Sequence, residues 1–369
     1  MGSLHASPPP PLPPENPASG FRILISVCGR NDAAGTTVPN WLDIYNPADH
    51  TWDHIGGIPG IPSGHVLKGF AMVALGDVVY VIGGRLCLKV RAPDADGFAD
   101  RDVAVRSDVL RYKVATREWS ACAPLALPRF DFACVACNGK IYVAGGQFDF
   151  SSARGTSAAE VYDPSEGRWA PLPAMTALRY KCVGVAWKGR FHVVGGFAAR
   201  EGSGCLTVVE RSSAEVFDEG REEWELMPGM WQLDVPPNQI VPVDGRLFSS
   251  GDCLKDWKGH IEMYDGNLNI WSVIERSQLH DLSRLVGGGA AGDGRAYALQ
   301  RLYLTMAPIG DHLYFVAGYR VKGDETRSMT VVHAFNTATR AGEAWESFEP
   351  LTEDGVKEMC SHCCVVQLS

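Results

Sequence analysis

The chain has 369 residues, of which 46% are hydrophobic and 21% are charged, and its formal net charge is −9 at pH 7. This composition is typical of a globular protein. The negative charge argues against nucleic acid and anionic membranes as partners, because both favour a basic protein face. No apolar run is long enough to span a bilayer as a helix, and the N-terminus lacks the pattern of a secretory signal.

The N-terminal segment, residues 1–20, is proline-rich, with the sequence MGSLHASPPPPLPPENPASG. We expect a disordered tail here, because such a composition favours polyproline II and cannot build a core; a docking peptide for a proline-binding domain is the alternative. The 11 cysteines are an odd number, and they are irregularly spaced. This usage favours a reducing compartment, the cytoplasm or the nucleus.

An aromatic residue followed seven positions later by tryptophan recurs along the chain. Five copies keep this spacing, and a sixth has three more residues in its turn: Tyr45 and Trp52, Tyr112 and Trp119, Tyr162 and Trp169, Phe217 and Trp224, Tyr264 and Trp271, and Phe335 and Trp345. The intervals indicate a repeating unit of about 50 residues with loops of unequal length.

A second signal stays in phase with the first. Apolar segments end in glycine pairs, namely Gly83 and Gly84, Gly145 and Gly146, and Gly195 and Gly196, with weaker copies at 246–251 and 312–318 and the most degraded at 23–29. A short apolar segment and a tight turn, such as Asn138-Gly139, precede most of them. Each unit therefore predicts four antiparallel strands, and such units cover their apolar faces by standing side by side around an axis. The one helical turn we expect lies near 277–286.

The Gly-Gly, Tyr and Trp pattern resembles the kelch repeat of the galactose oxidase/kelch superfamily, and the chain is similar to plant F-box/kelch-repeat proteins over residues 21–369. The resemblance implies an all-β fold, a six-bladed kelch β-propeller with four-stranded antiparallel blades. The N-terminal copy begins at its second strand (23–29), and the chain finishes with a segment, 362–369, that fits a lone first strand. We expect these two ends to complete one blade and to close the ring, which removes exposed sheet edges.

In such blades, the connections from second to third strand and from fourth strand to the next blade share one face. The variable segments fall there: residues 85–107, which we expect to be a solvated loop, and about 274–301. Because recognition usually lies in loops on a rigid scaffold, this face is the predicted partner-binding surface. Its candidate residues are Arg30, Arg85, Arg129, Phe130, Arg179, Tyr180 and Arg301, since arginine and aromatics are enriched in hot spots. The alternative for Arg129 and Arg179 is that they pair with acidic neighbours and brace the turn between the fourth strand of one blade and the first strand of the next.

Metal and catalytic motifs carry less weight. Cys134 and Cys137 lie three apart on a predicted strand and so point to opposite faces. Cys360, His362, Cys363 and Cys364 resemble a zinc cluster in composition, but a predicted strand begins at His362, which favours free thiols. Asp252, Asp256 and His260 come close to the Glu-x3-Asp-x3-His iron motif of kelch-type specifier proteins, with Asp in place of Glu.

These observations favour a non-enzymatic protein-binding module without a cofactor, monomeric, with a protein partner. The resemblance implies target recognition in ubiquitin ligation or a scaffolding role, although the family's F-box is not found in the sequence. The alternative is a small-molecule or iron-dependent activity at the channel mouth, for which Asp252, Asp256 and His260 would be the ligands.

Overall fold

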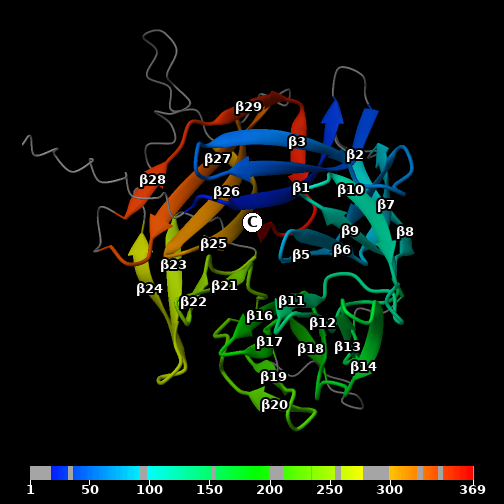
Figure 1. Cartoon of the computed structure of the whole chain (residues 1–369), viewed down its shortest axis with the longest axis vertical. Helices are drawn as coiled ribbons and strands as arrows, with labels where there is room; N and C mark the ends of the chain where they lie inside the picture. Colours follow the sequence, from blue (N-terminus) through cyan, green and yellow to red (C-terminus); the bar gives the residue numbers. More distant parts are fainter. Residues whose placement is uncertain are drawn as a thin grey trace, which may run out of the picture.

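The structure, a computed structural model, describes residues 18–31, 36–91, 98–151, 154–199, 211–233, 235–253, 259–276, 299–321, 327–339 and 344–368. These residues form an all-β protein in which antiparallel sheets are arranged around a common centre (Figure 1). Within the same ranges, no helical segment has the length and apolar character needed to cross a bilayer.

Three main sheets form the first part of the chain, numbered in chain order. Sheet 1 has β1 (Phe21–Asn31), β2 (Thr36–Asn46), β3 (Thr51–Gly57), β30 (Val356–Met359) and β31 (Cys364–Gln367). Sheet 2 has β5 (Ala71–Leu75), β6 (Val78–Ile82), β9 (Val109–Lys113) and β10 (Glu118–Cys122). Sheet 3 has β11 (Ala133–Cys137), β12 (Lys140–Ala144), β13 (Ala159–Asp163) and β14 (Arg168–Leu172).

Three further main sheets follow. Sheet 4 has β16 (Val183–Trp187), β17 (Arg190–Val194), β19 (Ala214–Asp218) and β20 (Glu223–Met227). Sheet 5 has β21 (Ile240–Val243), β22 (Arg246–Ser249), β23 (His260–Asp265) and β24 (Ile270–Arg276). Sheet 6 has β25 (Leu299–Ile309), β26 (His312–Val321), β27 (Arg327–Asn336), β28 (Trp345–Ser347) and β29 (Leu351–Asp354).

The repeated aromatic pairs lie directly opposite one another on the two outer strands of every main sheet. Tyr162 pairs with Trp169 in sheet 3, and the looser copy, Phe335 with Trp345, keeps the same register in sheet 6. Across the six pairs, the ring centroids lie 4.9–5.2 Å apart. Such cross-strand pairs stabilise a sheet locally and fill the space between neighbouring sheets.

Neighbouring main sheets meet along their innermost strands. β5 contacts β11, β11 contacts β16, β16 contacts β21, β21 contacts β25, β25 contacts β30 and β31, and β31 contacts β5. The indole nitrogens add a second tie farther out: that of Trp169 donates to the carbonyl oxygen of Ala123 in the segment that leaves sheet 2, at 2.9 Å. The sheets therefore form a continuous circle of contacts, consistent with a kelch propeller.

The two ends of the chain pair in sheet 1, as the sequence predicted. Residues Phe21 to Leu24 of β1 pair antiparallel with Cys364 to Gln367 of β31. The final strand begins at Cys364, two residues later than expected, and the chain adds an unpredicted strand, β30, which pairs with the other half of β1. The seam thus rests on two C-terminal strands.

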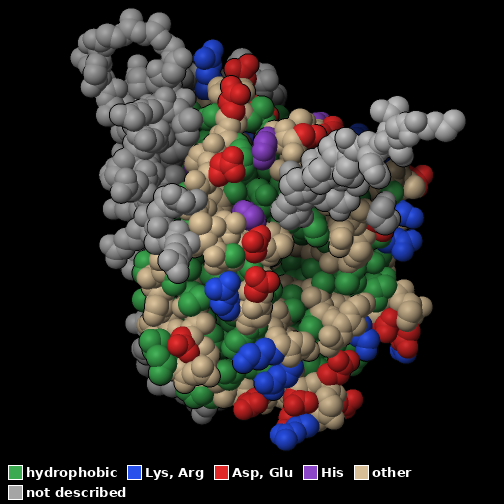
Figure 2. Space-filling model, turned by 60° about the vertical axis from the view of Figure 1, so that its left-hand side comes forward, with side chains coloured by type: hydrophobic (Ala, Val, Ile, Leu, Met, Phe, Trp, Pro, Cys, Tyr) green, Lys and Arg blue, Asp and Glu red, His purple; other side chains and the backbone are tan. Residues whose placement is uncertain are grey.

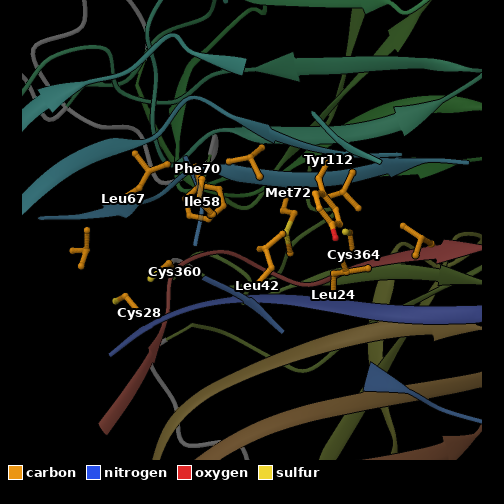
Figure 3. Packing of buried hydrophobic residues seen from close by; sticks show 14 of the residues in the cluster. Leu24, Cys28, Leu42, Ile58, Leu67, Phe70, Met72, Tyr112, Cys360 and Cys364 are labelled. Atoms are coloured by element: carbon orange, nitrogen blue, oxygen red, sulfur yellow. The ribbon is translucent and has the colours of Figure 1, made fainter. Parts of the chain in front are cut away.

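The seam packs on sheet 2 through an apolar cluster (Figure 3). Leu24, Leu42 and Cys364 of sheet 1 meet Met72 and Tyr112 of sheet 2. At the other end of the cluster, Ile58, Leu67 and Phe70 lie close together above Cys28 and Cys360 (Figure 3). Both of these cysteines are free and buried.

The prediction of a solvated loop over residues 85–107 was wrong. β7 (Arg85–Arg91) and β8 (Phe98–Val105) form a hairpin, and β4 (His65–Lys68) joins it as a third strand. The alternating charges that suggested a loop are cross-strand partners, because Lys89 stands opposite Asp100 and the two side chains are bonded at 2.9 Å. A smaller pair, β15 (Leu178–Tyr180) and β18 (Phe197–Ala199), occupies the corresponding place beside sheet 4.

Two other expectations fall mainly outside the described residues. The helical turn near 277–286 lies outside them entirely. Of the segment 274–301, the structure describes only the end of β24 and the start of β25.

Candidate binding face

Five connecting segments share one face of sheets 1 to 4: those between β3 and β5, β6 and β9, β10 and β11, β12 and β13, and β14 and β16. We call it the connection face. The segments bond to one another, because the amides of Gly84 and Gly146 donate to the carbonyl oxygens of Arg129 and Arg179 at 2.8 and 2.7 Å. Positive φ angles at both glycines, 100° and 93°, permit this approach and require glycine.

The segment that leads into sheet 3 is held from inside by Arg129. Its side chain is buried with an exposed fraction of 0%, and Nη2 donates to Oε1 of Glu160 at 2.6 Å. Nη1 donates to the carbonyl oxygens of Gly145 and Ala158, both at 2.9 Å. Burial lowers the pKa of the Arg129 guanidinium, and the charge of Glu160 opposes this shift.

Arg179 repeats this arrangement at the start of sheet 4. Its side chain is also 0% exposed, and Nε donates to Oε1 of Glu215 at 2.9 Å. Nη1 donates to the carbonyl of Gly195 at 3.0 Å, and Nη2 donates to Oγ of Ser213 at 2.7 Å. The other oxygen of Glu215 accepts bonds from the amide and the hydroxyl of Thr176 at 2.6 and 2.8 Å.

The geometry of both arginines matches the alternative reading of the sequence, in which they brace the chain. Each guanidinium joins two connecting segments of its own sheet. The backbone carbonyl of each arginine accepts a hydrogen bond from the second glycine of the pair in the preceding sheet. A direct contact between these two side chains and a partner stays a prediction. Their full burial makes them supports beneath the connection face.

Aromatic rings and an arginine gather above Arg129. The guanidinium carbon of Arg85 lies 5.2 Å from the ring centroid of Phe130, whose ring is 5.9 Å from that of Phe150. Phe130 is buried, but Phe148 and Phe150 have exposed fractions of 42% and 45%. Large exposed aromatic rings beside an arginine are typical of protein interfaces.

A similar group lies next to it above Arg179. The rings of Tyr180 and Phe197 are 5.1 Å apart, and the guanidinium carbon of Arg211 lies 5.3 Å from the ring centroid of Phe197. Tyr180 and Phe197 are also cross-strand partners. The structure therefore brings Arg85, Phe130 and Tyr180 to the connection face, and partner binding by these three residues stays a prediction.

The remaining two candidates lie at strand ends elsewhere on the ring. Arg301 stands near the start of β25, opposite Tyr319, and Arg30 stands near the end of β1, opposite Thr37. Burial raises the pKa of Tyr319 to about 12, and Arg301 opposes the shift. Partner binding by these two arginines stays a prediction.

Asp131 and Lys181 link the segments that lead into sheets 3 and 4. The amide of Asp131 donates to the carbonyl of Gly69 at 2.8 Å, and the amide of Lys181 donates to the carbonyl of Asp131 at 2.7 Å. Both residues have positive φ angles, 53° and 51°. Burial raises the pKa of the Asp131 carboxyl, while Lys181 and Arg85 oppose the shift. These two backbone hydrogen bonds hold the segments that contain Gly69, Asp131 and Lys181 together on the connection face.

The proposed iron ligands are only partly described. Asp252 is buried and forms a bridge with Pro237, and the imidazole of His260 lies against Gly251, but Asp256 falls outside the described residues. Within the described residues, no three His, Cys, Asp or Glu side chains are grouped so that they could hold a metal ion.

The cysteine motifs are distributed among separate apolar clusters. Cys134 and Cys137 pack into different clusters, which confirms that they point to opposite faces of β11. Burial raises the pKa of the Cys363 thiol to about 12 and that of Cys360 well above its usual range. Burial also lowers the pKa of His362 to about 4. These thiols lie in apolar surroundings, and burial favours their neutral form.

Sequence reasoning missed several residues of the connection face. Phe148 and Phe150 were available as a Phe-Asp-Phe sequence one residue after a glycine pair. Glu160 and Glu215 occupy matching places in AEVYD and AEVFD, and this match was the signal for the arginine partners.

Comparisons with known proteins agree with this fold. The family model described as "Kelch motif" matches residues 128–176. The chain is 34% identical over 187 residues to the F-box/kelch-repeat protein At1g16250 of Arabidopsis thaliana, covering 51% of this chain and 45% of the relative. It is 32% identical over 255 residues to the F-box/kelch-repeat protein OR23 of the same plant, covering 62% of this chain and 55% of the relative.

A zebrafish (Danio rerio) protein, Kelch repeat and BTB domain-containing protein 12, is 26% identical over 260 residues, covering 64% of this chain and 38% of the relative. The chain spans about half the length of the Arabidopsis relatives that it matches. The matched kelch motif contains β11 to β14, Arg129 and the Tyr162–Trp169 pair. The chain therefore carries a kelch motif, and it is similar to plant F-box/kelch-repeat proteins over 51–62% of its length.

Proposed function

We propose that the six main sheets are the blades of a six-bladed kelch β-propeller, closed by the pairing of β31 with β1. The circle of contacts between innermost strands supports this architecture, as do the six aromatic pairs. Deleting residues 360–369 removes β31, so we expect loss of cooperative thermal unfolding. A truncated protein that melts like the full chain would contradict the seam.

We further propose that this propeller is a non-enzymatic recognition module that binds a protein partner on the connection face. The observation that carries the proposal is the exposure of Phe148 and Phe150 on this face, where the ring of Phe150 packs near Phe130, itself in contact with Arg85. Rigidly supported aromatic rings bind at low entropic cost, because the free protein already holds them in place. Tyr180, Arg30 and Arg301 extend the same proposed surface around the ring.

The similarity to F-box/kelch-repeat proteins supports a role in recruiting a target for ubiquitin ligation, or a scaffolding role. Charged side chains of both signs are interspersed on the face shown in Figure 2, with hydrophobic side chains between them. The net charge of −9 likewise suits a protein partner better than a polyanion. We propose that the protein acts as a monomer in the cytoplasm or the nucleus.

Affinity capture with variants of the full chain tests the binding face. The double variant Phe148→Ser with Phe150→Ser should lose most captured partner, because truncating interface aromatics costs binding strongly. The matched control is Leu268→Ser with Ile270→Ser, which removes two exposed apolar side chains of sheet 5, 66% and 39% exposed. Equal capture by wild type and by the double phenylalanine variant would overturn the assignment.

A further inference from the structure

The position in sheet 2 that corresponds to the buried arginines Arg129 and Arg179 holds an apolar residue. The second glycine of each pair packs against the segment leading into its own sheet, where it meets the carbonyl of Lys68, Phe130 or Tyr180. The residues directly before these are therefore equivalent: Leu67 in sheet 2, Arg129 in sheet 3 and Arg179 in sheet 4. Strand register adds a second equivalence, because Leu110 pairs with Val81 as Glu160 pairs with Val143 and Glu215 with Val193.

Two leucines thus replace an arginine and a glutamate, and a cavity of about 310 Å³ opens at this place. Leu67, Leu110 and Ala121 form its apolar walls, together with Ile58 from the segment after β3. Leu67 and Ile58 stand at the border of the cluster in Figure 3. The cavity lies on the connection face, since it is lined by residues that follow β3, β6 and β10.

The backbone acceptors of the arginine sites are still present in this cavity. Arg129 donates to the carbonyls of Gly145 and Ala158, and the residues at the same places in sheet 2 are Gly83 and Asp108, which both line the cavity. The equivalence holds in the backbone, because Gly83 donates to Asp108 at 2.9 Å as Gly145 donates to Ala158 at 3.1 Å. Within the described residues, no donor reaches the carbonyl of Gly83.

A carboxylate completes the set. Asp108 occupies the place of Ser213, whose hydroxyl oxygen accepts a bond from Nη2 of Arg179 at 2.7 Å. The Asp108 side chain is 54% exposed, and Oδ2 accepts from Nε of Arg106 at 2.5 Å. A carboxylate has about four lone-pair sites, so Asp108 can accept from a second guanidinium while Arg106 stays in place.

We propose that this cavity, the guanidinium pocket, binds an arginine side chain presented by the protein partner. The apolar walls suit the methylene stem, and the carbonyls of Gly83 and Asp108 with the Asp108 carboxylate suit the planar donors. The net charge of −9 favours a cationic group at close range. The proposal rests on the proposed function, and it names one anchor of the partner within the connection face.

The test uses three blocked pentapeptides that differ only in a central arginine, lysine or citrulline, titrated into the full chain and followed by saturation-transfer NMR. The arginine peptide should bind most tightly, and Asp108→Asn should weaken it about tenfold, since a charge-assisted bond is lost. Ala121→Trp should abolish binding by filling the cavity from an exposed strand position. Asp53→Asn is the matched control, because Asp53 is 51% exposed and also pairs with an arginine, Arg117, away from the pocket.

Equal binding of the lysine and arginine peptides, or of the citrulline and arginine peptides, would overturn the proposal. Binding that survives Ala121→Trp would also overturn it, provided that thermal melting shows this variant to be folded. Partner capture separates this inference from the proposed function. If capture is lost in the Phe148 and Phe150 double variant but unchanged in Asp108→Asn and Ala121→Trp, the face stands and the guanidinium pocket fails.

Discussion

The segments leading into sheets 3 and 4 are braced by a buried arginine and glutamate, whereas the one leading into sheet 2 has two leucines beside a cavity. The backbone is the same in all three, because the glycine pairs and their hydrogen bonds recur. In sheets 3 and 4, backbone carbonyls accept hydrogen bonds from an arginine of the same chain. Among the residues that the structure describes, the corresponding carbonyls of sheet 2 have no such arginine and are available to a partner. Side-chain identity at two positions decides between a structural brace and a binding site.

The three-stranded sheet beside sheet 2 is joined to sheet 1 by charged side chains. Lys68 and Lys89 both pair with Asp100 and with Glu358, so four charges join β4, β7 and β8 to β30 at the seam. Such a network near the surface is weaker than a buried brace, because water and salt screen it. Sheets 3 and 4 therefore contain buried ion pairs, whereas the strands beside sheet 2 are held to sheet 1 by a partly exposed network.

Breaking one buried pair should give the largest effect. Arg179→Leu leaves the Glu215 carboxylate buried without its guanidinium, so we expect a loss of about 3–5 kcal/mol in the free energy of unfolding, measured by urea denaturation. The control is Arg190→Leu, which removes a partly exposed arginine that lies 3.7 Å from Glu225. It should cost below about 1 kcal/mol. Similar losses in both variants would show that Arg179 is no brace.

Replacing both partners should cost less than replacing one. The double variant Arg179→Leu with Glu215→Leu converts sheet 4 to the sheet 2 arrangement and leaves no buried charge alone. We expect a net loss of about 1–2 kcal/mol, since the Thr176 amide loses an acceptor. A double-mutant cycle gives the coupling energy. Additive single effects would contradict the equivalence of the two arrangements.

The repeating parts of this fold could be predicted from sequence because their determinants are local. Tyr162 and Trp169 face each other in a hairpin with a four-residue turn, and the glycine pairs that follow β6, β12 and β17 have positive φ angles. The seam was predictable as well, since two incomplete units complement each other.

The missed features depend on contacts between distant residues. Nothing near Arg129 shows that its carboxylate partner is Glu160, which is 31 residues away. The sequence of the charged hairpin at 85–105 resembles a loop, because its ionic pairs, such as Lys89 with Asp100, form only after β7 and β8 are aligned. The cavity is harder still to predict, because it is the space that the side chains of Leu67 and Leu110 leave empty.

The converse substitution adds a carboxylate to sheet 2 and tests whether it strengthens arginine binding. Leu110→Glu places an acid where Glu160 and Glu215 stand in the braced sheets, so the arginine pentapeptide should bind about tenfold more tightly. Stability should fall by about 1 kcal/mol, because apolar packing is lost at a half-buried position. Calorimetric titration checks the affinity, and Leu110→Gln separates charge from shape. No gain with glutamate over glutamine would count against an arginine site.

The smallest expected effect concerns the surface network at the seam. Burial alone would raise the pKa values of Glu358 and Asp100, but Lys68 and Lys89 outweigh burial and lower both. The folded protein therefore binds fewer protons here than the unfolded chain in mildly acidic solution. The stabilisation is complete above the ordinary carboxyl pKa of about 4 and is lost as pH falls through the lowered values.

Glu358→Gln should consequently cost at most about 1 kcal/mol at neutral pH, because the network is partly exposed. Its cost should shrink as pH falls below about 4, where the wild type loses the same interaction. Urea midpoints measured across this range check the prediction, and 1 M salt should reduce the difference at every pH because it screens partly exposed charges. If the loss of unfolding free energy in Glu358→Gln grew on acidification, Glu358 would act as a neutral hydrogen-bond donor. The charges of Lys68 and Lys89 would then not be what stabilises the seam.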